Sequence, residues 1–248
     1  MKKLIIGLLT GFLSMSGWSA CTYDLDVTQA TLNSEEPGSL IFPNRSGQKV
    51  GFNIFSTSTL KYFLATNNNV TLNSSGITVP SSSIYAYEYK FKVPKNQLLS
   101  TEQLLFFPVA HIGKNGGQST FLSNVGYTNA STENSAVNKF TISDPNANTS
   151  LVELNISNNS NDYQYIGIYI NPISKQAGFI VNGVNKGYLS NYTLPVINSF
   201  FMIAAGLNGI SPNSPNIGKE VSIELITDAT KMTQSYPTGT TDICGNTI

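Results

Sequence analysis

Strict alternation of apolar and polar residues is the feature that most limits the folds open to this chain. In the segment 220–225, aliphatic residues alternate with glutamate and serine, and the segments 21–28 and 151–157 have the same pattern. Successive side chains of a β-strand point to opposite faces, so a period of two creates one apolar and one polar face. The pattern is typical of half-buried antiparallel strands.

Short strands with this character recur along most of the chain. Further strands are predicted at 39–42, 49–55, 60–65, 84–93, 104–111, 119–123, 137–143, 165–171, 177–181, 187–189 and 200–207. Turns rich in Gly, Pro and Asn separate them, and only the short stretch 94–105 favours a helix. This spacing indicates an all-β fold. We expect a two-sheet antiparallel jelly-roll sandwich, without a repeat or linker that would divide it.

The N-terminus predicts export. Lys2 and Lys3 precede an apolar run at 4–13, and small or polar residues dominate from 14 to 20. This layout is typical of a secretory signal peptide, and the apolar run is shorter than the roughly 20 residues that span a bilayer. We therefore expect a signal peptide at 1–20, a single β-sandwich domain at 21–248 and no transmembrane segment. The protein would be periplasmic or extracellular.

Cys21 and Cys244 are the two cysteines of the chain. An even number of cysteines in an exported protein favours a disulfide between them. The residues 18–21, Trp-Ser-Ala-Cys, also resemble a lipobox. An outer-membrane lipoprotein, anchored through Cys21, is therefore the alternative, and it would leave Cys244 unpaired.

The charge balance argues against two classes of partner. Without Lys2 and Lys3, 12 of the 14 basic residues remain against 14 acidic ones, a net charge of −2. Proteins that bind nucleic acid or anionic membranes need clustered Lys and Arg. We therefore expect no nucleic-acid partner.

No carboxylate pair in the sequence has a catalytic pattern. Glycosidases use two carboxyl groups about 5–9.5 Å apart, and on one strand this favours the order E-x-D-x-E, which is absent. Asp24 and Asp26, and likewise Glu220 and Glu224, lie opposite apolar faces and are interpreted as solvated outer residues.

Other catalytic and metal-binding patterns are also incomplete. His111 is the one histidine, at a predicted strand end, and a structural role explains it better than a Ser-His-Asp site. The loop that starts at Asp144 lacks the Gly and Glu that a calcium loop requires at its sixth and twelfth positions. We therefore expect no catalytic residue, metal or cofactor.

Aromatic residues are the best candidates for ligand contacts. Tyr85 and Tyr87 belong to a strand that has four aromatic residues on one face, while Tyr163 and Tyr165 form a second cluster beside Asp162. A tyrosine combines a flat apolar ring with a hydroxyl group, which suits the apolar faces and hydroxyl rims of sugars. These five residues are the predicted ligand-binding set. The alternative is that the aromatic face is part of the core.

The segment 165–189 has the most specific pattern. A strand that contains Gly167-Ile168-Tyr169-Ile170 is followed by Phe179-Ile180-Val181 and the dipeptide Asn182-Gly183, the strongest signal for a two-residue hairpin. This meander resembles the concanavalin A-like lectin and glucanase superfamily, which includes laminin-G-like and SPRY-type domains. The resemblance implies a jelly roll whose first and last strands lie close together. As a whole, the chain also resembles small exported bacterial proteins of unknown function.

Together these patterns predict a non-catalytic exported binding module, with carbohydrate as the leading class of ligand. The expected partner is a glycan or a cell-surface protein. The first alternative is a structural or protein-interaction role at the cell surface, of the adhesin or antigen kind. The second is a glycan-cleaving enzyme whose carboxylates meet only in space.

Overall fold

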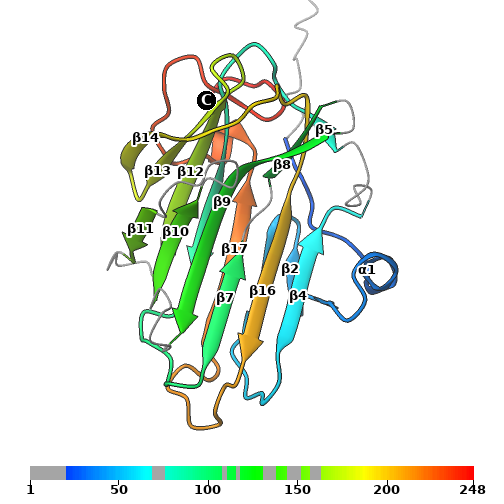
Figure 1. Cartoon of the computed structure of the whole chain (residues 1–248), viewed down its shortest axis with the longest axis vertical. Helices are drawn as coiled ribbons and strands as arrows, with labels where there is room; N and C mark the ends of the chain where they lie inside the picture. The colour runs from blue at the N-terminus through cyan, green and yellow to red at the C-terminus, as the bar shows by residue number, and fades with distance from the viewer. Residues whose placement is uncertain are drawn as a thin grey trace, which may run out of the picture.

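The computed structural model describes residues 21–68, 76–107, 111–115, 118–130, 138–143, 152–156 and 163–248. Two β-sheets pack face to face, and their long strands run along the longest axis of the molecule (Figure 1). The predicted all-β sandwich is confirmed. The predicted signal peptide, residues 1–20, lies outside the described residues.

Sheet 1 contains ten strands, most of them antiparallel to their neighbours. Its order is β1 (Leu40–Ile41), β4 (Lys61–Thr66), β16 (Met202–Asn208), β7 (Gln103–Phe107), β9 (Gln118–Ala130), β8 (His111–Asn115), β15 (Asn198–Phe200) and β5 (Ile77–Thr78). β10 (Lys139–Ser143) pairs with β9 and with β11 (Val152–Asn155). β1 is parallel to β4.

Sheet 2 contains eight strands and positions the site described below. Its order is β14 (Val184–Asn191), β13 (Gln176–Val181), β12 (Tyr163–Asn171), β6 (Tyr85–Lys92), β17 (Glu220–Ile226), β3 (Lys49–Asn53) and β2 (Asn44–Ser46). The short β18 (Thr241–Asp242) pairs in parallel with β6.

Aromatic side chains fill the space between the sheets. The ring centroids of Tyr87 in sheet 2 and Phe201, beside β16 of sheet 1, are 5.0 Å apart. The corresponding distance between Phe91 and Phe140 is 4.9 Å. Edge-to-face pairs at these distances add to the stabilisation that burial provides. The apolar faces produced by the period-two pattern therefore meet in one core.

The meander β12–β13–β14 forms as the sequence predicts. Asn182 and Gly183 have φ angles of 47° and 83°, both in the left-handed region that a type I′ turn requires. The Asn182 side chain accepts a hydrogen bond of 2.8 Å from the Tyr165 amide, which ties the turn to β12.

The segment 21–28 was expected to be a strand, and this expectation is wrong. Its side chains do alternate between buried and exposed, but its backbone forms no ladder. The Leu25 amide donates to the Gly47 carbonyl, in the turn between β2 and β3 of sheet 2, whereas the Val27 amide donates to the Thr66 carbonyl of sheet 1. The segment crosses from one sheet to the other, so it cannot pair continuously with either.

The helix predicted at 94–105 is also wrong, because buried side chains bind the backbone groups that a helix would use. The Leu98 amide donates to the Asn129 side chain over 3.0 Å. The Leu99 amide donates to Glu102 over 2.9 Å. Side-chain acceptors of this kind compete with helical hydrogen bonds.

The helix that does form was not predicted. It is α1 (Gln29–Glu35), which lies beside β4 (Figure 1). Thr28 caps it, since the Thr28 hydroxyl accepts a hydrogen bond of 3.1 Å from the Thr31 amide. Leu32 is its one buried residue. An apolar face this small is why the pattern was not recognised in the sequence.

A disulfide joins Cys21 to Cys244, with their Cα atoms 5.9 Å apart. It brings the start of the described chain to the C-terminal segment, as predicted. Because the bond uses the Cys21 sulfur, that atom is not available for a lipid anchor. A disulfide fits a protein that folds in an oxidising compartment. Within the described residues, no helix has the length and apolarity needed to cross a membrane.

Candidate functional site

Tyr85 and Tyr87, two of the predicted ligand-binding residues, are wrongly assigned. Both side chains have 0% exposure and belong to the main core. The opposite face of β6 has Glu88, Lys90 and Lys92, so the aromatic face is the one that packs against sheet 1. No ligand reaches these two rings without opening the sandwich.

Tyr163 and Tyr165 lie elsewhere, on the outer face of β12, and both are half-buried. The Nζ atom of Lys90, on the neighbouring strand β6, lies 4.5 Å from the centre of the Tyr163 ring. This is a cation–π distance. Asp162, the third residue of the predicted cluster, lies outside the described residues.

Two rows of side chains cross the outer face of sheet 2. In the first row, Tyr165 is paired with Lys90, Lys90 with Glu224, and Glu224 with Lys49. The row therefore alternates in charge from β6 to β3. Opposite charges on neighbouring strands stabilise a sheet modestly.

The second row lies beside the first and contains two small residues. It runs from Tyr163 to Lys92, Ser222, Gly51 and Asn44, each paired with the next. Ser222 and Gly51 rise little above the sheet, so the larger side chains around them enclose a depression.

Gly51 is required for this arrangement. A Cβ atom at Gly51 would lie 2.5 Å from the carbonyl oxygen of Val221 and 2.8 Å from the Cβ of Ser222. Backbone atoms cannot give way to such a contact. Any larger residue would both separate β3 from β17 and raise the floor of the depression.

Two hollows lie on this face of sheet 2, one of them above this floor, and they share Glu220. One, of about 420 Å³, is lined by residues that include Asn44, Lys49, Gly51 and Ser222. The other, of about 470 Å³, lies where β6 ends and β17 begins. Ligand sites typically measure about 300–1,000 Å³. We call these two hollows together the outer-face groove.

Glu220 is the electrostatic centre of the groove. Its carboxylate accepts hydrogen bonds from Lys92 over 2.8 Å and from Lys49 over 3.1 Å. These two bonds, that of Lys92 first, lower the pKa of Glu220 from 4.5 to about 2. The carboxylate is therefore ionised at neutral pH and holds both ammonium groups at the groove wall.

Sequence reasoning missed the groove because its residues come from separate strands. Lys49, Lys92 and Glu220 occupy polar positions of period-two strands, which is the one local signal they offer. A polar residue on such a strand is interpreted as solvent-exposed as long as the order of the strands is unknown. The register of β3, β17 and β6 brings the three together.

Glu88 and Glu102 are buried and have structural roles. Glu88 accepts hydrogen bonds of 2.7 Å from the amides of Thr233 and Gln234. Glu102 accepts from Ser211 and from Leu99. Their protein donors replace water around the charge, as burial of a carboxylate demands.

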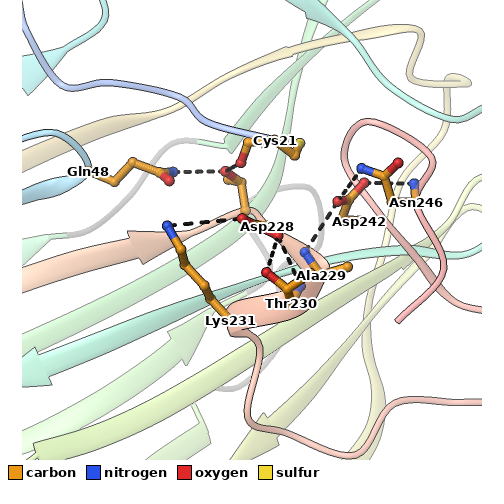
Figure 2. A network of polar contacts seen from close by, with 9 residues as sticks. Cys21, Gln48, Asp228, Ala229, Thr230, Lys231, Asp242 and Asn246 are labelled. Carbon is orange, nitrogen blue, oxygen red and sulfur yellow. Dashed lines mark hydrogen bonds and ion pairs between the residues drawn. The ribbon is translucent and has the colours of Figure 1, made fainter. Parts of the chain in front are cut away.

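Asp242 ties the C-terminal segment together through hydrogen bonds to Ala229 and Asn246 (Figure 2). Its carboxylate accepts from the Ala229 amide over 3.2 Å and from the Asn246 side chain over 2.9 Å. The sulfur atoms of Cys21 and Cys244 lie close to this carboxylate. Since they are bonded to each other, they are not thiolate ligands for a metal.

The C-terminal segment crosses the outer face of sheet 2 beyond the groove. The Tyr236 hydroxyl lies 3.2 Å from Glu88, and burial together with this carboxylate raises the pKa of Tyr236 well above its usual value. A Cβ atom at Gly167 would lie 2.5 Å from the Tyr236 hydroxyl oxygen. The segment therefore covers this part of β12 and β6 and leaves the groove open.

The sequence patterns at His111 and at the Asp144 loop are incomplete for a catalytic residue and for a calcium site, respectively. The His111 backbone begins β8 of sheet 1, on the other sheet from the groove. Asp144, Asn146 and Asn148 lie outside the described residues.

Comparisons with known proteins were made with the whole chain. A family model described as "Domain of unknown function (DUF4882)" matches residues 8–246. No curated protein matches the chain.

Several solved structures are similar to the chain at low identity. The VIP36 exoplasmic/lumenal domain, in a Ca²⁺/Man3GlcNAc-bound form, is 14% identical with a TM-score of 0.39, over 81% of this chain and 91% of that one. Lectin UEA-II complexed with galactose is 11% identical with a TM-score of 0.37, over 74% and 88%. A Trypanosoma rangeli sialidase in complex with sialic acid is 11% identical with a TM-score of 0.36, over 74% of this chain and 26% of the sialidase. The chain thus spans about a quarter of the length of that sialidase.

Proposed function

The chain belongs to the family described as Domain of unknown function (DUF4882), and we propose that it binds carbohydrate, without cleaving it, in the outer-face groove. The meander around Asn182-Gly183 supports placing the sandwich among concanavalin A-like folds, and the disulfide supports export. The partner in this proposal is a glycan rather than a cell-surface protein.

The observation that carries the proposal is the composition of the groove. Its small-residue floor lies between ammonium, carboxylate and amide groups, from Lys49, Glu220 and Asn44. Tyr163 lies beside the groove, because it is paired with Lys92, which lines the hollow of about 470 Å³. Sugars present hydroxyl groups that both donate and accept hydrogen bonds, with an apolar ring face between them. Charged partners strengthen such hydrogen bonds, and a tyrosine ring offers an apolar surface.

The arrangement of the acidic groups supports binding without cleavage. Glu220 and Glu224 are four residues apart on one strand, which separates their Cα atoms by about 13 Å. Each carboxylate is also held by lysines, with Glu224 lying 3.6 Å from Lys90. A general acid must instead keep its proton near neutral pH, whereas the pKa of Glu220 is lowered to about 2.

The proposal is tested with a glycan array that uses the purified, disulfide-bonded protein. Tyr163→Ala and Glu220→Gln should each weaken binding about tenfold, which corresponds to about 1.4 kcal/mol. Tyr62→Ala is the control, because it removes a surface tyrosine that lies on β4 of sheet 1, away from the groove. It should bind like the unmodified protein.

Three outcomes would contradict this proposal. If no glycan is bound, a protein partner becomes the better hypothesis. If binding is unaffected by both Tyr163→Ala and Glu220→Gln, the site lies elsewhere. Release of new reducing ends from a bound glycan would show that the protein is an enzyme.

A further inference from the structure

Positive charge is concentrated around the outer-face groove. Among the described residues that line its two hollows, five cations face one carboxylate, a net charge of +4: Arg45, Lys49, Lys92, Lys95 and Lys219 against Glu220. The chain after residue 20 has a net charge of −2, from 12 basic and 14 acidic residues. The groove therefore has the opposite sign to the molecule as a whole.

A neighbouring hollow does not share this excess of positive charge. A third hollow, of about 290 Å³, lies beside it on sheet 2. Among its described lining residues, Lys49 and Lys231 are balanced by Asp24 and Glu224, so its net charge is zero. The presence of lysines on the outer face is thus not enough by itself to give a hollow a net positive charge.

The excess is largest in the hollow of about 470 Å³, where three lysines meet. Lys92 ends β6, Lys95 follows it after Pro94, and Lys219 directly precedes β17. They meet because β6 and β17 are antiparallel neighbours, so the end of one strand lies beside the start of the other.

The three ammonium groups are differently placed. Lys92 is paired with Glu220 over 2.8 Å. The Lys219 ammonium donates to the neutral Asn216 side chain over 3.0 Å, so this bond leaves its charge uncompensated. Lys95 and Lys219 are both exposed to solvent.

We infer that the glycan bound in the groove is anionic, and that its acidic group occupies the hollow lined by Lys92, Lys95 and Lys219. Ammonium groups are donors without acceptors, so a carboxylate or sulfate oxygen is a better partner for them than a hydroxyl. Clustered positive charge also attracts anions over several ångströms and raises the rate of association. This inference rests on the proposed function, since it names the class of glycan that the same groove takes.

The experiment compares charged and neutral forms of one sugar chain. Oligogalacturonate and its methyl ester share rings and linkages and differ in the carboxylate charge. Dextran sulfate and dextran provide the same comparison for sulfate. The unmodified protein should bind the charged form of at least one pair about tenfold more tightly. That preference should shrink as salt rises from about 50 mM to about 500 mM, because salt screens exposed charges.

Single substitutions locate the effect. Lys95→Gln and Lys219→Gln should each reduce the preference for the charged form about threefold. Lys231→Gln is the matched control, because it removes the same charge from the balanced hollow. Lys219→Arg should retain the preference.

The outcomes separate this inference from the proposed function. Equal affinity for the charged and neutral forms of both pairs, with binding in the groove, overturns the anionic ligand and leaves the proposed function standing. A preference that survives both Lys95→Gln and Lys219→Gln overturns the assigned hollow. No binding to any charged or neutral glycan overturns both.

Discussion

The residues next to a tyrosine in the sequence do not reveal whether its side chain is buried in the core or lies at the surface. Tyr87 and Tyr163 each lie in a strand beside polar residues. The first has 0% exposure and packs against Phe201, whereas the second is half-buried beneath Lys90. The difference follows from the face of the sheet to which each points. At the scale of one residue, the side-chain type therefore permits sugar binding, and its position decides whether a sugar can reach it.

Two buried tyrosines differ in whether their hydroxyl groups have partners. Among the described residues, no group hydrogen-bonds to the Tyr89 hydroxyl. The Tyr127 hydroxyl can donate to Asn138 over 2.8 Å or to Pro94 over 3.1 Å, and it accepts from Asn129. Burial without a partner carries the full desolvation cost of the hydroxyl group.

We therefore predict opposite effects for one chemical change. Tyr89→Phe should leave the free energy of unfolding unchanged or raise it by about 1 kcal/mol, because it removes a buried polar atom without a partner. Tyr127→Phe should lower it by about 1–3 kcal/mol, because Asn129 loses a partner. Urea denaturation measures both values. A larger loss for Tyr89→Phe than for Tyr127→Phe would contradict the assigned hydrogen bonds.

At the scale of elements, the C-terminal segment depends on one side chain of β6. Glu88 has 0% exposure and accepts four hydrogen bonds from the segment 233–236. The donors are two amides and the hydroxyl groups of Thr233 and Tyr236. Glu88 thus accepts most of the hydrogen bonds that hold this irregular segment on the sheet, beside the apolar packing of Met232 and Tyr236.

Glu88→Gln should release this segment. The amide side chain presents a donor where four donors already converge, so the free energy of unfolding should fall by about 2–3 kcal/mol. Hydrogen exchange at the Thr233 and Gln234 amides should accelerate more than exchange in β17. Glu153→Gln is the matched control, because it breaks an exposed ion pair with Lys139 and should cost less than about 1 kcal/mol. Equal costs for the two variants would show that Glu88 is no anchor.

At the scale of the whole molecule, one covalent link constrains nearly the entire described chain. Cys21 and Cys244 are separated by 223 positions. Closing a loop of that length lowers the entropy of the unfolded chain and contributes about 5 kcal/mol in the simple entropic model. The bond also joins the crossing segment 21–28 to the C-terminal segment, whose strand β18 pairs with the central strand β6 of sheet 2.

The double variant Cys21→Ala, Cys244→Ala should therefore lower the free energy of unfolding by up to about 5 kcal/mol. The groove should keep its structure, because the strands that form it, β2, β3, β17 and β6, are hydrogen-bonded to one another independently of the disulfide. Urea denaturation with and without reductant measures the change in the unmodified protein. A midpoint that does not respond to reduction would show that the link contributes nothing.

The amino-acid sequence by itself determined the local features of this protein. The period-two pattern located β6, β12, β13 and β17, because the alternation of a strand is a property of neighbouring residues. The dipeptide Asn182-Gly183 determined its turn, since both residues tolerate positive φ. The even cysteine count and the export pattern predicted the disulfide.

The tertiary structure alone decided which face became the core and where the groove lies. Tyr85 and Tyr87 could have faced either way, and the packing of sheet 1 against β6 buried them. Residues 94–105 form no helix, because the side chains of Asn129 and Glu102 accept hydrogen bonds from backbone amides of this segment. Asn129 is distant from the segment in sequence. Lys49, Lys92 and Glu220 meet because β17 lies between β3 and β6. Strand order is set by the burial and pairing of the whole chain, so no local pattern contains it.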